Sequence, residues 1–152
     1  MKLEEAIKSN KFRNNIHKAT LNILYTAWWL KRVMAVELKE YGLTHEQFNV
    51  LRILKGKHPE QICVGEIASR MIEKSSNVPR IIDRLETKKL VKRVTSDADK
   101  RETRIVLTQA GINILQHSTE RINKVIDSSI NISEKKADSL NQILEEMRRT
   151  ER

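Results

Sequence analysis

Two short helices, a turn and a charged hairpin are predicted between Cys63 and Gly111, and this segment constrains the fold more than any other. Four apolar residues of the second predicted helix recur at the spacing of one helical face: Val78, Ile81, Ile82 and Leu85. A polar stripe lies about 120° away around the same helix. It is formed by Asn77, Arg80, Arg84 and Lys88. A helix that buries one stripe and exposes arginines on another, just before a basic hairpin, is suited to a DNA groove.

The charge balance favours the same kind of partner. The 152 residues include 29 Lys and Arg against 20 Asp and Glu, a formal net charge of +9. Eleven basic and six acidic side chains lie between Arg70 and Arg104, so +5 of that excess falls in the predicted DNA-binding segment. Polyanions are therefore the expected partners, nucleic acid before an anionic membrane surface, and the alternative is a merely soluble basic protein.

Three motifs in this segment resemble the MarR family of winged-helix transcription regulators. They are the helix ending RIIDRLETKKLVKR, the hairpin core Asp99-Lys100-Arg101 and the exit Leu107-Thr108-Gln109-Ala110-Gly111. The resemblance extends over nearly the whole chain, but its specific motifs lie within Leu43–Gly111. It implies a mostly α (α+β) winged helix-turn-helix protein that dimerises through helices at its two ends.

A single domain of residues 1–152 is expected, with a winged-helix lobe at 43–111 and dimerisation helices at 11–41 and 109–150. Thr44 and Gln47 are predicted to cap the helix after Gly42, and Ser75 or Ser76 to cap the helix that carries Arg80. Further predicted elements are a helix Gly65–Met71, strands Val91–Thr95 and Arg104–Thr108, and helices Gln109–Ile130 and Glu134–Arg149. The segment Ile62–Val64 fits either a short strand or the entry to a helix.

DNA contacts are predicted from the second helix of the motif, because arginine reads guanine and a helix N-terminus meets phosphate. The predicted residues are Ser75, Ser76, Asn77, Arg80, Arg84 and Lys88. The alternative is an ordinary solvated helix face. In the hairpin, or wing, the resemblance implies that Asp99 orients Arg101 toward the minor groove, while Lys100 and Arg93 read as phosphate contacts. The alternative there is an ordinary polar turn.

A small aromatic acid is a further expected ligand, by resemblance to family members that bind such ligands between the dimerisation helices and the lobe. The candidate wall residues are Tyr25, Trp28, Trp29 and Arg32. For Trp28 itself a place in the protein core is expected, with the ligand wall as the alternative.

Other chemistry is not predicted. The histidines form no cluster, and the sequence has no phosphate loop, nucleophile elbow or metal-ligand spacing, so no enzyme, cofactor or metal is expected. Cys63 is the one cysteine and reads as a small apolar residue, with a redox role as the alternative. No stretch resembles a signal peptide or a membrane span, which makes the cytoplasm the expected location.

The expected function is site-specific binding of double-stranded DNA at a pseudo-palindromic operator by a homodimer. The protein would regulate transcription, as a repressor whose DNA affinity a ligand modulates. A sequence-indifferent, nucleoid-type DNA-binding protein is the alternative, and an affinity ratio between selected and random DNA separates the two.

Overall fold

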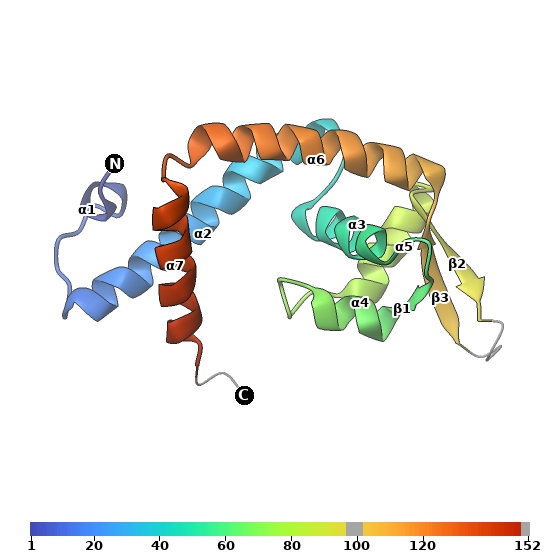
Figure 1. The fold of residues 1–152 in the computed structure, drawn as a ribbon, viewed down its shortest axis with the longest axis horizontal. Helices are drawn as coiled ribbons and strands as arrows, with labels where there is room; N and C mark the ends of the chain where they lie inside the picture. The colour runs from blue at the N-terminus through green and yellow to red at the C-terminus, as the bar shows by residue number, and fades with distance from the viewer. Residues whose placement is uncertain (97–101, 150–152) are drawn as a thin grey trace.

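The structure is a computed structural model that describes residues 1–96 and 102–149 (Figure 1). Its helices are α1 (Leu3–Ala6), α2 (Asn15–Glu40), α3 (His45–Lys57), α4 (Val64–Arg70), α5 (Val78–Thr87), α6 (Gln109–Ser129) and α7 (Glu134–Met147). Its strands are β1 (Ile62–Cys63), β2 (Val91–Thr95) and β3 (Thr103–Leu107). The predicted mostly helical class with a small antiparallel sheet is confirmed.

Helix α2 starts later than the predicted residue 11 because Asn14 caps it, its Oδ1 accepting a hydrogen bond of 2.9 Å from the backbone N–H of His17. At the other end Gly42 takes a left-handed φ of +64°. The backbone N–H of Leu43 then donates back to the carbonyl of Leu38, which closes a Schellman turn. Helix α3 follows at once with the predicted capping box, in which Thr44 and Gln47 satisfy each other's backbone N–H groups.

The sheet has the order β1-β3-β2, with all neighbours antiparallel. Ile62–Val64 forms both of the predicted alternatives, a short strand and the entry to a helix. Ile62 and Cys63 pair with β3, and Val64 begins α4. Strand β3 ends at Leu107, one residue before the predicted end. Thr108 leaves the strand because its side chain accepts a hydrogen bond from the N–H of Gly111 and caps α6.

The core lies between α3, α4, α5 and the sheet, with α6 packed across it. Its fully buried side chains include Leu51, Ile67, Ile82, Leu85 and Ile105. Helix α6 extends from the lobe to α2 (Figure 1), where Arg121 of α6 lies 2.5 Å from the carboxylate of Glu37. Helix α5 is thus part of a lobe that α6 connects to the terminal helices.

The terminal helices bury little of their apolar surface within one chain. Helix α7 has no buried residue, and α2 buries only Leu38. Trp28 is 51% exposed, so its predicted place in the core is wrong for the single chain. Among the described residues no helix is long and apolar enough to cross a bilayer.

Candidate nucleic-acid interface

Helix α5 divides its two faces as its sequence predicts. Val78, Ile82 and Leu85 are buried in the core, while Arg80 and Arg84 are exposed. The helix starts at Val78, not at the predicted serines, because Asn77 is the cap and its Oδ1 accepts a 3.2 Å hydrogen bond from the N–H of Arg80. Pro79 falls in the first turn, where its missing N–H costs nothing.

A groove of about 460 Å³ runs between the start of α3 and α5. Its lining includes five of the six predicted recognition residues: Ser75, Ser76, Asn77, Arg80 and Arg84. We call this surface the α3–α5 groove. Thr44 and Glu46 from the first turn of α3 also line it. Sequence reasoning assigned Thr44 only a capping role, because nothing in the local pattern shows that the start of α3 faces α5.

The serines before the helix differ in their surroundings. The hydroxyl of Ser75 lies 3.5 Å from Oε1 of Glu73. The hydroxyl oxygen of Ser76 is buried and has no hydrogen-bond partner within residues 1–96 and 102–149. A buried polar atom without a partner is costly, so the Ser76 hydroxyl is a strained feature of the turn before α5.

Lys88, the sixth predicted residue, lies apart from the groove. It is the C-cap of α5, and its ammonium group donates to the carbonyl of Gly42 and to Oε1 of Gln47, the latter at 2.9 Å. A lysine stem is long enough to reach across to the α2–α3 connection, which its helical phase alone does not reveal. In this structure Lys88 therefore joins the end of α5 to the start of α3.

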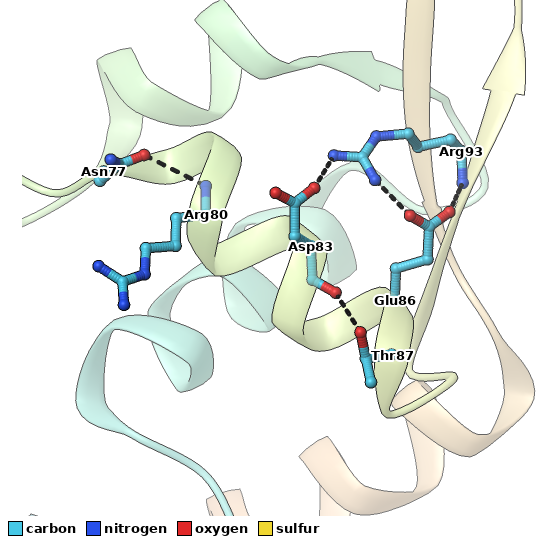
Figure 2. A network of polar contacts seen from close by, with 6 residues as sticks. All are labelled: Asn77, Arg80, Asp83, Glu86, Thr87 and Arg93. Carbon is cyan, nitrogen blue, oxygen red and sulfur yellow. Dashed lines mark hydrogen bonds and ion pairs between the residues drawn. The ribbon is translucent and has the colours of Figure 1, made fainter.

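Arg93, predicted as a phosphate contact from the wing, is exposed, and its side chain is paired with α5. Its guanidinium group bonds Asp83 and Glu86, both on α5 (Figure 2). The hydrogen bond that Arg93 donates to Asp83, followed by the charge of Glu86, raises the already high pKa of Arg93, so the group is always charged. The other predicted wing residues, Asp99, Lys100 and Arg101, lie outside the described residues.

A second ion pair joins the groove to the long helix. Nζ of Lys31, on α2, lies 2.5 Å from Oε2 of Glu73, in the turn before α5. The hydrogen bond and charge of Lys31 lower the pKa of Glu73. Both side chains are about half exposed, 53% and 47%, so the pair contributes little to stability. Its effect is to neutralise a carboxylate beside the α3–α5 groove.

The predicted ligand residues lie along one stretch of α2. The rings of Tyr25 and Trp28 are 5.4 Å apart between centroids, and the guanidinium of Arg32 lies 5.7 Å from the Trp28 ring. Tyr25 and Trp29 line a pocket of about 330 Å³, and Trp29 and Arg32 line another of about 370 Å³. Trp28 lines neither of these two pockets, so they do not unite the four predicted residues within one chain.

Cys63 lies in β1 opposite Arg104 and is partly buried. In the part of the chain that the structure describes, no three His, Cys, Asp or Glu side chains are grouped to hold a metal ion. The surface with the most evident chemistry is therefore the basic, helix-terminal one around Arg80 and Arg84.

A helix-turn-helix followed by a β-hairpin on a three-stranded sheet defines a winged-helix protein. Comparison with known proteins identifies the family: residues 43–103 match the MarR family. The HTH-type transcriptional regulator MgrA of Staphylococcus aureus is 31% identical over 106 residues, which cover 70% of each chain. The chain belongs to the MarR family, whose members are transcription regulators and not enzymes.

Two further proteins are similar. The HTH-type transcriptional regulator YpoP of Bacillus subtilis is 33% identical over 85 residues, and these cover 56% of this chain and 59% of YpoP. MepR of Staphylococcus aureus, solved in complex with DNA, superposes with a TM-score of 0.76. It is 22% identical, and the match covers 84% of this chain and 94% of MepR, so it supports the fold.

Proposed function

We propose that this protein is a homodimeric regulator that binds duplex DNA at a pseudo-palindromic site through α5 and the wing. The observation that carries the proposal is the exposure of Arg80 and Arg84 along the α3–α5 groove. The Ser76 hydroxyl, which has no hydrogen-bond partner within the described residues, lies at the N-terminal end of the same helix, where the helix dipole favours phosphate. The DNA complex of MepR, which has the same fold, is further support.

Within this interface the residues have different tasks. Arg80 and Arg84 read base edges, while Ser75, Ser76 and Asn77 contact phosphates. Asp99, Lys100 and Arg101 supply the wing contacts, with Arg101 in the minor groove. The repressor role and its modulation by a small aromatic acid at Tyr25, Trp28, Trp29 and Arg32 are further parts of the proposal. A ligand acts in this way only if it prefers a dimer whose two α5 helices do not fit the operator.

A homodimer is supported by the uncovered apolar side chains of the two terminal helices. On α7 they are Leu140, Ile143 and Met147, which are 46%, 56% and 50% exposed. On α2 they are Ile16, Leu24, Trp28 and Val36, which are 73%, 62%, 51% and 62% exposed. An isologous contact between two copies buries such surfaces and sets two α5 helices about one DNA turn apart.

The test is a binding titration on a duplex selected from a random pool. Arg80→Ala should cost about 1–3 kcal/mol on the selected duplex and relax the preference at one base pair in each half-site. Lys124→Ala, an exposed cation on α6, is the charge-matched control and should leave that preference intact. If Arg80→Ala and Lys124→Ala each lower the affinity for the selected duplex and for random DNA by the same factor, the sequence-indifferent alternative is correct.

A further inference from the structure

Arg93 makes three contacts with one helix from a neighbouring strand. Its Nη2 lies 2.5 Å from Oδ1 of Asp83, and its Nη1 bonds Oε2 of Glu86. The backbone N–H of Arg93 donates to the other oxygen of Glu86 at 3.3 Å. Figure 2 shows the two carboxylates converging on Arg93, while Arg80 extends away from them on another side of α5.

These contacts fix a direction as well as a distance. A guanidinium is a planar fork, and two carboxylates on separate prongs hold it in one orientation. Glu86 accepts hydrogen bonds from both the backbone and the side chain of Arg93. A rotation of α5 about its axis would therefore move Glu86 relative to β2 and strain both bonds. Strand β2 is the first strand of the wing hairpin, so these three residues connect the hairpin to α5.

The negative charges of Asp83 and Glu86 would by themselves repel the phosphates of DNA. Asp83 and Glu86 are on the same helix as Arg80 and Arg84, and their side chains are 63% and 39% exposed. Carboxylates near phosphates weaken binding, and ion pairs this exposed contribute little to stability. Neither DNA affinity nor folding therefore accounts for the pair, whereas orientation does.

We propose that Asp83, Glu86 and Arg93 form a clamp that sets the angle between the wing and α5, which makes Arg93 a positioning residue for site discrimination. This role replaces the phosphate contact expected from the sequence, and it rests on the proposed function. Two elements that enter different grooves reach their contacts together only when their mutual angle matches the duplex. Loosening the clamp should therefore harm binding to the selected site more than binding to random DNA.

The experiment compares two clamp variants with one control of equal charge change. Asp83→Asn and Glu86→Gln each remove one negative charge and loosen the clamp. Asp127→Asn removes the same charge from α6, where the exposed Asp127 lies outside the α3–α5 groove and has no ion-pair partner within the described residues. Dissociation constants are measured for the full-length protein on the selected duplex and on a random duplex of the same length, at one salt concentration.

Electrostatics alone predicts tighter binding of both duplexes by all three variants. The clamp predicts that Asp127→Asn keeps the ratio of the two affinities, whereas Asp83→Asn and Glu86→Gln lower that ratio about five- to tenfold, the loss expected when one base contact is misplaced. Thermal unfolding of each variant should stay within a few degrees of wild type, since the ion pairs are exposed. An unchanged ratio for both clamp variants overturns the proposal.

Arg93→Lys separates positioning from phosphate binding. Lysine keeps the charge but lacks the planar fork, so the affinity ratio should fall in Arg93→Lys as it does in Arg93→Ala. A phosphate contact would instead survive in Arg93→Lys, and Arg93→Ala would reduce the slope of log affinity against log salt by about one. That second pattern contradicts the clamp while leaving the proposed function intact. Wild-type protein that prefers no duplex contradicts the proposed function, and the clamp falls with it.

Discussion

A β-carbon on Gly111 would lie 2.1 Å from the carbonyl oxygen of Leu90 and 3.2 Å from Cδ2 of Leu107. The start of α6 thus crosses the chain at the end of α5 with no space for a side chain. The same carbonyl of Leu90 accepts a 3.1 Å hydrogen bond from the N–H of Thr108, so it is not able to move aside cheaply. This close approach explains why the segment from Leu107 ends in glycine.

Replacing Gly111 with alanine should destabilise the protein by about 1–3 kcal/mol or more, because the added methyl group meets backbone and not a flexible side chain. Urea unfolding measures the loss. Gly56→Ala is the control, since Gly56 lies in α3 with open space around its Cα. That change should stabilise the protein by about 0.5–1 kcal/mol through helix propensity. Equal effects of the two substitutions would contradict the close approach.

Lys89→Gly should make the protein more stable. Lys89 has a φ of +59°. It stands at the end of α5, where its N–H donates to Glu86 and the N–H of Leu90 donates to Leu85 in a Schellman motif. A residue with a side chain costs about 1–2 kcal/mol in this conformation, and the substitution by glycine removes that cost. The greater flexibility of glycine in the unfolded chain offsets part of the stabilisation. A net gain of about 1 kcal/mol in urea unfolding is expected. Thr87→Gly, in the right-handed part of the same helix, should lower stability, and a gain in that variant would contradict the explanation.

Local chemistry is what the sequence predicts well. The Thr44–Gln47 capping box, the apolar stripe of α5 and the residues of β2 all depend on neighbours a few positions away, and all three are confirmed. The cap of α5 was wrong by one or two residues, because Ser75, Ser76 and Asn77 are all suitable caps and local preference does not rank them.

Long side chains that bond distant elements were not predictable. The helical position of Lys88 and the strand position of Arg93 predict DNA contacts. In the structure the charged group of Lys88 bonds Gly42 and Gln47, and that of Arg93 bonds α5. Their partners depend on which elements pack against each other. The periodicity of one helix or strand does not show which other elements lie beside it. Trp28 is a related case, since the apolar pattern of α2 resembles that of a core helix although this residue is 51% exposed in the single chain.

The dimer proposal predicts that a charge on α7 separates the two copies. Ile143 is 56% exposed in the single chain, and its burial against a partner would be worth about 1.5–3 kcal/mol. Ile143→Asp should therefore raise the dissociation constant of the dimer tenfold or more in sedimentation experiments. Ile72→Asp is the control, because Ile72 is 81% exposed but lies in the lobe, next to α4. A wild-type protein that sediments as a monomer at micromolar concentration would argue against the proposed dimer.

Stability should fall as the pH drops below about 6.5, and His45 should contribute to that loss. Burial of its ring, which contacts Met34 with Nε2 3.3 Å from the sulfur, lowers the pKa of His45, and the charge of Lys31 acts in the same direction. The unfolded chain then binds a proton at a higher pH than the folded protein does. The contribution is fully present above the ordinary pKa of 6.5 and is lost as the pH falls toward the folded value.

The check is urea unfolding of wild type and His45→Gln at several pH values between about 7.5 and 5.5. The lowered pKa of Glu73 matters only near and below the ordinary carboxyl value of 4.5, so this window isolates the histidine. The free energy of unfolding should depend less on pH in the variant. Parallel curves for the two proteins would falsify the assignment.

The central claim is that two copies of this winged helix bind one DNA site with sequence preference. The most direct measurement is selection of bound duplexes from a random pool by the full-length protein, followed by titration of the recovered sequence at several salt concentrations. We predict a palindrome with half-sites about 10 bp apart. On that duplex several neutralised phosphates per copy should reduce affinity by a factor of about 10³ or more between 50 and 200 mM salt. A pool that stays random after selection, or an affinity that does not change with salt, would contradict the account.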